Sequence, residues 1–554
     1  MFLCALSAPL APGDPLIMRC RQLSVLSVLA AAPLSNFAMS LAPPWDDMRI
    51  KHTWNAVPHN WETLGHPPAG TTIDLHLALK PHHENALIDA LYAVSDPWSP
   101  KHVPSNTPPC TMYSHVPLLC CRYGAHLSRE QAAQLVAPHP DTLQLINSWL
   151  QHHDLPSSSI STTHGDSWLT LAGIPVSQAN EMLGASYQLY RRTGTNDTTI
   201  LRTIGYALPA VLHTHVQTVV PTTYFPSTHT LRQTPRRRPV KAAADMASGT
   251  VLSSRDDDDD DDDVEVTPSD LRSLYRTFAY MPAATDENVL AIAGYEDDYP
   301  SPDDLMTFMA EFRMDAEDAT FTVKQINKGR NDPSQPSTEG NLGTQYAQAM
   351  AYPTRQIYYS TGGEMWYIPG SNKPAKGDAI LEWLIYVLSQ PKVPQTINTS
   401  YGVPENNLPL EYAWTLCNMF AQLGARGVSV IFASGDHGVG NGDCRAKDGS
   451  GRVQFVPLFP ASCMCSVLFL LGGSTPSQAQ VSLHGHGFTG PYVTSVGGTT
   501  GDIEIAAGIS GGGFSNYFPR PEYQDNSVPT FLQRFGSQYN GWYKCVQVFC
   551  HDLT

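Results

Sequence analysis

The stretch Val428-Ser429-Val430-Ile431-Phe432-Ala433-Ser434-Gly435-Asp436-His437-Gly438-Val439-Gly440 carries the strongest structural signal in this chain. Its first six residues are mostly apolar and β-branched, which predicts a strand buried inside a parallel sheet. The strand runs directly into a glycine-rich turn that carries Asp436. Sites in α/β proteins form at such turns, so the segment predicts a site around Asp436. For this segment alone, a tight turn that needs only glycines and a turn-forming Asp is the alternative interpretation.

The rest of the C-terminal half alternates between strand and helix patterns. We expect strands at 288–294, 394–402 and 428–433, and helices at 303–312, 341–352 and 411–424. Such alternation predicts an α/β fold in which a parallel sheet has helices on both faces. The carboxyl ends of the strands then share one edge, where Tyr401 and Asp436 would both lie.

The N-terminal half reads as a small α+β domain at 41–235. It contains an alternating strand at 72–79 and an amphipathic helix at 84–93. A further helix follows Ser128, which has Gln131 three residues later and so predicts a capping box. Residues 236–265 then join a basic cluster to a run of Asp, which predicts a solvated linker or a processing segment.

Length and charge limit the functions that are possible. A chain of 554 residues is expected to hold two or three domains. Its net charge is −17, and it remains −9 when the Asp run 256–263 is left out. Nucleic-acid binding needs a basic surface, so a nucleic-acid partner is not expected.

The first forty residues combine an upstream extension with a secretory signal. From Met18 the chain has two arginines, an apolar stretch at 23–34 and small residues around Met39. This pattern predicts a signal peptide that starts at Met18 and is cleaved after about Ser40. The apolar run is too short to span a membrane, so we expect a secreted, extracellular protein without a membrane partner.

Cysteine usage suggests one disulfide in the C-terminal half. The chain has 11 cysteines, of which Cys417, Cys444 and Cys463 remain when the termini and the suspect segments described below are set aside. In an oxidising compartment, Cys444 and Cys463 are the expected pair. Cys417 is then the odd thiol without an assigned partner.

Ordered motifs along the chain resemble one peptidase family. They are Lys51-His52-Thr53-Trp54, Tyr123-Gly124, Val266-Thr267-Pro268-Ser269, Ser434-Gly435-Asp436, Ser495-Val496-Gly497-Gly498-Thr499 and Ser510-Gly511-Gly512-Gly513-Phe514-Ser515. Together they resemble the sedolisin family of serine-carboxyl peptidases, in particular the fungal tripeptidyl peptidases. The resemblance implies a subtilisin-like peptidase domain at 266–554 and a propeptide, or activation, domain at 41–235.

The chemistry that the resemblance implies is peptide hydrolysis at acid pH. A Ser attacks the carbonyl, a Glu acts as general base, and an Asp four residues later on the same helix face supports the Glu. Carboxylates this close share protons at low pH. A further, protonated Asp donates to the oxyanion.

These family roles map incompletely onto this chain. Asp436 matches the oxyanion Asp, and Glu339 matches the general base, although an acid favoured by the helix dipole is its alternative interpretation. The partner Asp is replaced by Gly343. The nucleophilic Ser belongs to a Gly-Thr-Ser motif that is absent from the chain, and the family's calcium site lies beyond residue 554, so no metal ligand is assigned.

The resemblance also implies a peptide-binding surface. Its residues are Ser400, Tyr401, Gly402, Ser434, Gly435, Ser510, Gly511 and Gly512. Gly508-Ile509-Ser510-Gly511-Gly512 also fits the nucleophile elbow of α/β-hydrolases. That elbow needs a helix directly after the Ser, and Gly513, Pro519 and Pro521 argue against one.

Two segments interrupt the resemblance. They are the 19 residues at 103–121 and the 27 residues at 464–490. The likeness also stops after Tyr543. We interpret these features as introns retained in the gene model, with genuine lineage-specific loops as the alternative.

The sequence therefore predicts a secreted, acid-active zymogen that releases tripeptides from protein N-termini or cleaves internally. Its expected partners are protein or peptide substrates and its own propeptide, and a monomer is expected. The chain as written lacks the nucleophile, so it is predicted to be inactive. The alternative is a non-catalytic secreted pseudopeptidase, or a propeptide-type inhibitor or binding protein.

Overall fold

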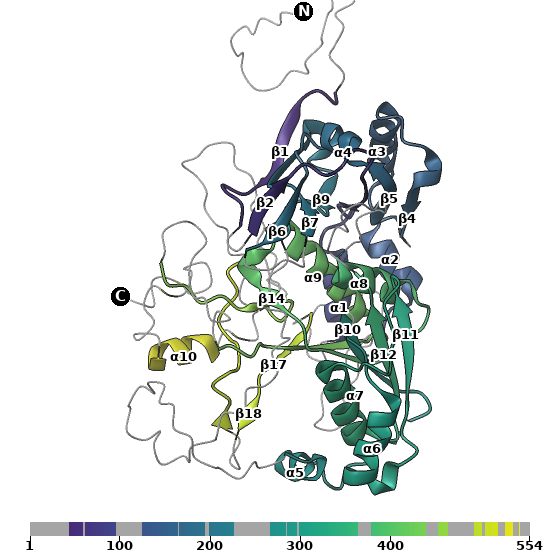
Figure 1. Cartoon of the computed structure of the whole chain (residues 1–554), viewed down its shortest axis with the longest axis vertical. Coiled ribbons are helices and arrows are strands. Elements are labelled where there is room, and N and C mark those ends of the chain that lie inside the picture. Colours follow the sequence, from purple (N-terminus) through teal and green to yellow (C-terminus); the bar gives the residue numbers. More distant parts are fainter. Residues whose placement is uncertain are drawn as a thin grey trace, which may run out of the picture. The chain divides into compact units, whose positions relative to one another are not determined.

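The computed structural model describes most of the chain (Figure 1). The described residues are 44–58, 61–95, 124–163, 165–193, 199–225, 266–283, 285–295, 298–363, 378–438, 452–463, 492–500, 505–518, 524, 527–535 and 542. All of them belong to one compact unit, Pro44–Thr554. The predicted signal, the linker and both suspected inserts lie outside the described residues. Among the described helices, none has the length and apolar character needed to cross a bilayer.

The N-terminal part is built from three antiparallel sheets and four helices. The four-stranded sheet has the order β4 (Ile160–Thr162), β5 (Trp168–Pro175), β3 (Thr72–Leu79) and β9 (Val216–Val220). The smaller sheets pair β1 (Met48–Thr53) with β8 (Gly205–Pro209), and β6 (Gln188–Arg192) with β2 (Trp61–Gly65) and β7 (Thr199–Arg202). The helices are α1 (Ala86–Ser95), α2 (Arg129–Val136), α3 (Pro140–His152) and α4 (Val176–Met182).

Local sequence signals account for much of this part. The strand predicted at 72–79 is β3, and its Ile73, Leu75 and Leu77 are fully buried in the same core as Trp149. The capping box at Ser128 is confirmed, because its hydroxyl accepts the Gln131 backbone N–H and the Gln131 side chain accepts the Ser128 N–H. Helix α1 begins two residues later than predicted.

The C-terminal part contains the predicted parallel sheet. Its six strands have the order β11 (Phe321–Ile326), β12 (Arg355–Thr361), β10 (Val289–Tyr295), β13 (Thr396–Thr399), β15 (Ser429–Ala433) and β17 (Thr494–Val496). Every neighbouring pair is parallel. This architecture confirms the α/β fold class, and it places the carboxyl ends of β10, β13 and β15 at one edge.

Helices cover both faces of the sheet. They are α6 (Pro302–Phe312), α7 (Thr338–Ala351), α8 (Ala379–Ser389) and α9 (Leu410–Ala425), with α5 (Pro268–Leu274) and α10 (Ser527–Phe535) beside them. Along β10, Ile292 packs in the cluster that includes Ala347 of α7, whereas Ala291 and Ala293 pack with α8 and α9. Because successive strand residues point to opposite faces, α7 lies on one face and α8 and α9 lie on the other.

Short strand pairs complete this half of the molecule. Strand β14 (Val403–Pro404) pairs antiparallel with β16 (Leu458–Phe459), and β18 (Thr499–Thr500) pairs antiparallel with β19 (Ile505–Ala506). Both pairs lie next to segments that the sequence assigns to the site. They therefore help to hold those segments in place.

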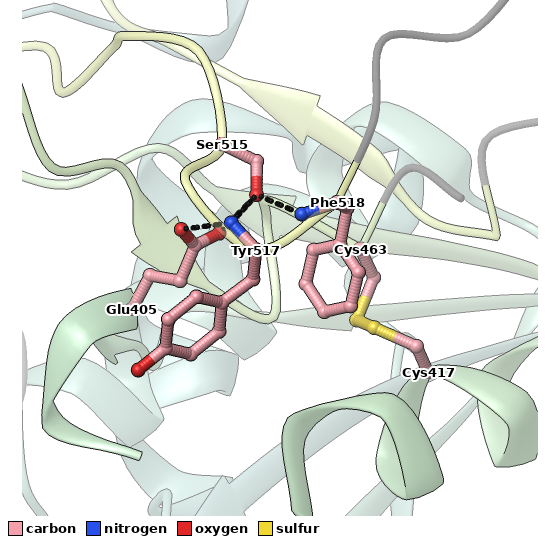
Figure 2. The surroundings of a disulfide bond; sticks show 6 residues. All are labelled: Glu405, Cys417, Cys463, Ser515, Tyr517 and Phe518. Carbon is pink, nitrogen blue, oxygen red and sulfur yellow. Dashed lines mark hydrogen bonds between the residues drawn. A yellow bond between two sulfur atoms is a disulfide. The ribbon is translucent and has the colours of Figure 1, made fainter. Parts of the chain in front are cut away.

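The observed disulfide corrects the predicted cysteine pairing. Cys463 is bonded to Cys417 of α9, with Cα atoms 5.5 Å apart (Figure 2). The expected pairing of Cys463 with Cys444 is therefore wrong, and Cys444 lies outside the described residues. The physical reason is proximity in three dimensions: the strand pair β14–β16 brings Cys463 back to α9, 46 residues from its partner in the sequence.

The N-terminal part packs directly on α8 and α9. Leu87 and Leu91 of α1 belong to the same buried cluster as Phe420 of α9. The Leu127 backbone N–H donates to the Ala425 carbonyl at 2.9 Å. His76 Nε2 lies 3.3 Å from a carboxylate oxygen of Glu382 in α8. These contacts show the N-terminal domain docked on the sheet-bearing domain.

Candidate active site

The turn after β15 is shaped by its glycines. Gly435 has a φ of +116°, a conformation that favours glycine, and a Cβ there would lie 2.7 Å from Leu458. Asp436 follows and is accessible to solvent. Partial burial raises the pKa of its carboxyl group, and the neighbouring His437 acts in the opposite direction. The turn thus presents an acid that holds its proton more tightly than usual.

Glu339 stands in the first turn of α7. The predicted start of this helix at residue 341 is wrong, because the Ser337 hydroxyl accepts the Gly340 N–H at 2.9 Å and caps the helix earlier. A Cβ at Gly340 would lie 2.6 Å from the Tyr299 carbonyl carbon. Glycine therefore lets the helix N-terminus lie directly on the chain that follows β10.

Three elements bring polar groups to Glu339. Burial raises the pKa of its carboxyl group, a hydrogen bond with Ser400 lowers it, and the charges of Asp298 and Asp436 raise it further. Ser400 follows β13 and Asp436 follows β15, so both come from the carboxyl edge of the sheet. The fold thus gathers Glu339, Ser400 and Asp436, which the sequence had proposed separately.

Asp298 is a neighbour of Glu339 that the sequence reasoning missed. It is only 2% exposed and accepts a hydrogen bond from the Tyr401 hydroxyl group. Tyr401 is itself buried, so its side chain binds this carboxylate from inside the protein. A signal was present in the sequence, because Asp298 closely follows the strand predicted at 288–294, whose carboxyl end lies at the same edge.

Gly343 lies one helical turn beyond Glu339 and faces β10. A Cβ there would meet Ile292 Cγ2 at 3.2 Å, so an Asp at this position would require Ile292 to move slightly. The helix itself therefore supplies no second carboxylate at this position. The carboxylates that act on Glu339 come from Asp298 and Asp436 instead.

The glycine-rich segment at 510–514 lies against the Asp436 turn. The Gly511 N–H donates to the Gly435 carbonyl at 3.0 Å, and a Cβ at Gly511 would lie 1.9 Å from the Ser434 carbonyl oxygen. A Cβ added at Gly512 would have no other heavy atom of the protein within 4 Å beyond its chain neighbours. Gly402 lies in the same region. A Cβ at Gly402 would lie 3.3 Å from Leu458, whose side chain also leaves no room for a Cβ at Gly435.

Ser510 takes part in local structure. Its hydroxyl oxygen accepts the Gly498 N–H at 2.9 Å, and residues 511–515, which follow it, are not helical. A nucleophile elbow requires a helix directly after the Ser, so the α/β-hydrolase interpretation has no support here.

The described residues offer no metal site for this chemistry. Within these parts of the chain, no group of three or more His, Cys, Asp or Glu side chains could hold a metal ion.

The chain is similar in sequence to known proteins along most of its length. Residues 120–225 match the family model described as "Pro-kumamolisin, activation domain". The chain is 31% identical over 526 residues to the tripeptidyl-peptidase SED2 of Arthroderma otae, covering 93% of this chain and 76% of that protein. It is 30% identical over 515 residues to a probable tripeptidyl-peptidase SED3 of Trichophyton verrucosum, covering 91% and 76%.

A solved structure is also similar. The Pseudomonas sedolisin, a serine-carboxyl proteinase, matches 47% of this chain and 65% of its own, at 20% identity and a TM-score of 0.29. The family of this chain is therefore shown by its sequence relatives.

Proposed function

Because this chain belongs to the sedolisin family of serine-carboxyl peptidases, we propose that it is the zymogen of a secreted, acid-active tripeptidyl peptidase. The observation that carries the proposal is that the charges of Asp298 and Asp436, which follow β10 and β15 at the carboxyl edge of the sheet, raise the pKa of Glu339. Carboxylates brought together in partly buried surroundings share protons at low pH. Such a group suits peptide hydrolysis in acid, where a carboxylate replaces histidine as the base.

Glu339 and Asp436 take the two proton-transfer roles. Glu339, unprotonated, accepts the proton of the attacking hydroxyl as general base. Asp436, protonated, donates a hydrogen bond to the oxygen that becomes negative in the tetrahedral intermediate. Asp298 acts on Glu339 from the buried side, and Ser400 hydrogen-bonds it.

The peptide substrate is proposed to lie along one wall, which two hydrogen-bonded, glycine-containing segments form together. Ser434 and Gly435 belong to the first segment, and Gly511 and Gly512 belong to the second. Their backbone groups would bind the peptide main chain as an added strand would. The open space at Gly512 leaves room for that approach.

The N-terminal domain is proposed to keep the enzyme inactive until processing. It buries α8 and α9 through the α1 contacts, and the contact of His76 Nε2 with the Glu382 carboxylate spans the boundary. The mature enzyme is proposed to act as a monomer on protein or peptide substrates.

One observation favours the non-catalytic alternative. Gly343 occupies the position of the family's helix Asp, and the 554 residues contain no Gly-Thr-Ser motif for the nucleophile. The chain spans about three quarters of the length of the relatives it matches. The test must therefore begin with the transcript.

The experiment has two stages. Sequencing the spliced transcript across the codons for 98–125, 340–346 and 460 onward shows whether the inserts remain and whether the frame reaches a Gly-Thr-Ser. The encoded protein is then expressed, matured in acid and assayed for tripeptide release, with Glu339→Gln and Asp436→Asn as controls. Acid-dependent release that both substitutions abolish supports the proposal. A transcript that reads as given, together with no turnover, would overturn it in favour of a binding protein.

A further inference from the structure

Glu405 is a fully buried acid that the proposed mechanism does not use. It is 0% exposed and directly follows β14. Buried carboxylates are rare unless several donors compensate for lost hydration, so its partners indicate what it does.

Most of the described donors to Glu405 come from one segment, residues 515–517, and the Ser462 hydroxyl beside Cys463 supplies a further hydrogen bond. Oε1 accepts the backbone N–H of Asn516 at 2.6 Å, and Oε2 accepts the Ser515 hydroxyl at 2.5 Å. Oε1 also accepts the backbone N–H of Tyr517 at 3.1 Å (Figure 2). The Ser515 oxygen accepts the N–H of Tyr517 at 3.1 Å and of Phe518 at 2.9 Å. One carboxylate and one hydroxyl thus fix four consecutive residues.

The backbone of Glu405 is fixed by the chain around β14 and β16. Its own N–H donates to the Pro457 carbonyl at 3.0 Å, and β14 pairs with β16 just before it. The disulfide at Cys463 ties the chain after β16 to α9, close to Phe518 (Figure 2). Residues 515–518 are therefore anchored to a part of the fold that a strand pair and a disulfide hold in place.

The same segment begins at the proposed active site. Gly511 is bound to the Asp436 turn through the Gly435 carbonyl, so residues 512–514 span the gap between two anchors. Gly513 has a φ of +115°, and glycines leave the backbone much freedom before folding. The position of this stretch depends on what fixes its ends.

We propose that Glu405 is a positioning residue that anchors 515–517 and thereby holds the glycine-rich stretch 511–514 beside the Asp436 turn. The assignment of this stretch as the peptide-binding wall rests on the proposed function. The anchoring itself rests on the hydrogen bonds alone, so the two can be tested separately.

Hydrogen exchange of backbone amides tests the anchoring in the full chain. In Glu405→Ala, the Asn516 N–H loses its acceptor and the Tyr517 N–H loses one of two, and we expect exchange at 509–518 to rise about tenfold or more. Amides of β10 and β12 should exchange at the wild-type rate. Glu405→Gln keeps one acceptor oxygen for both N–H groups and should restore most of the protection.

Asp378→Ala is the matched control. Asp378 is also a buried carboxylate that accepts two backbone N–H groups, those of Ile380 and Leu381 at the start of α8. Its loss should speed exchange at 379–382 and leave 509–518 unchanged. If Glu405→Ala does not fold, Ser515→Ala removes the other anchor and should speed exchange at the same segment.

Binding of a hexa-alanine peptide provides the second measurement. We expect Glu405→Ala to raise the Kd about tenfold and Glu405→Gln to stay near the wild type. The anchoring would be overturned if Glu405→Ala and Ser515→Ala both left exchange at 509–518 unchanged. It would also be overturned if they sped exchange equally throughout the protein. If the wild-type protein binds no peptide after maturation in acid, the proposed function fails, and the exchange data still decide the anchoring.

Discussion

The carboxyl group of Glu405 makes a quantitative prediction about stability and pH. Burial raises its pKa to about 7 from an ordinary value of 4.5, even though hydrogen bonds from Ser515 and from the backbone of Asn516 and Tyr517 oppose the shift. Between these two pH values, the folded protein holds a proton that the unfolded chain releases. The free energy of unfolding must therefore fall as pH rises through this range.

The size of the effect follows from the two pKa values. Each pH unit between them corresponds to 1.36 kcal/mol, so the ionisable group lowers stability by about 3 kcal/mol between about pH 4 and about pH 8. Glu405→Gln removes the titration and keeps the shape of the side chain. Relative to wild type, the variant should gain about 3 kcal/mol across this range.

Urea denaturation at matched pH values measures this difference. The difference in the free energy of unfolding between the two proteins at each pH contains no contribution from groups that titrate equally in both. Among the charged and titratable groups around Glu405, Tyr517 has a pKa raised by burial and by the charges of Glu405 and Glu411, so it stays protonated over this range. If the stability difference stays constant within about 1 kcal/mol from about pH 4 to about pH 8, the reasoning is refuted.

Three further predictions concern the site. In the active enzyme, Glu339→Gln should lower kcat by about 100-fold or more, and the wild-type kcat/KM should be bell-shaped in acid, because Glu339 must lose its proton while Asp436 keeps one. A flat acid profile would contradict these roles. Gly511→Ala should cost about 1–3 kcal/mol, because its Cβ would lie 1.9 Å from the Ser434 carbonyl oxygen, whereas Gly512→Ala, with open space, should change stability by less than about 0.5 kcal/mol. Equal urea midpoints for the two variants would argue against this packing. Gly343→Asp should raise the pKa of Glu339 further by like-charge repulsion, which NMR titration of the Glu339 carboxyl carbon can measure. An unchanged or lowered pKa would show that position 343 does not face Glu339.

Local patterns in the sequence predicted most of the elements around the site. The apolar, β-branched run at 428–433 became β15, and the alternation of strands and helices became a parallel sheet. These predictions succeed because the periodicity of apolar residues follows from the geometry of strands and helices themselves. The start of α7 was missed because the capping group, Ser337, lies four residues before the predicted start.

Pairings between distant residues could not be predicted in this way. The sequence favoured Cys444 as the partner of Cys463, yet the fold brings Cys417 to it from the middle of α9. No local pattern marks Glu405, whose partners Ser515, Asn516 and Tyr517 lie 110 to 112 residues along the chain. Such contacts depend on how strands and helices are stacked, and stacking leaves no periodic trace in either segment.

The sequence by itself determined the α/β class, the positions of most strands and helices and the residues that match the peptidase motifs, because each depends on neighbours within one turn or one strand. The tertiary structure decided which acids act on one another. Parallel strands carry their carboxyl ends to one edge, so Asp298 and Asp436, 138 positions apart, both act on Glu339. The raised pKa values of Glu339 and Asp436 follow from burial, and that of Glu339 also from the charges of Asp298 and Asp436, which act on it only in the folded protein.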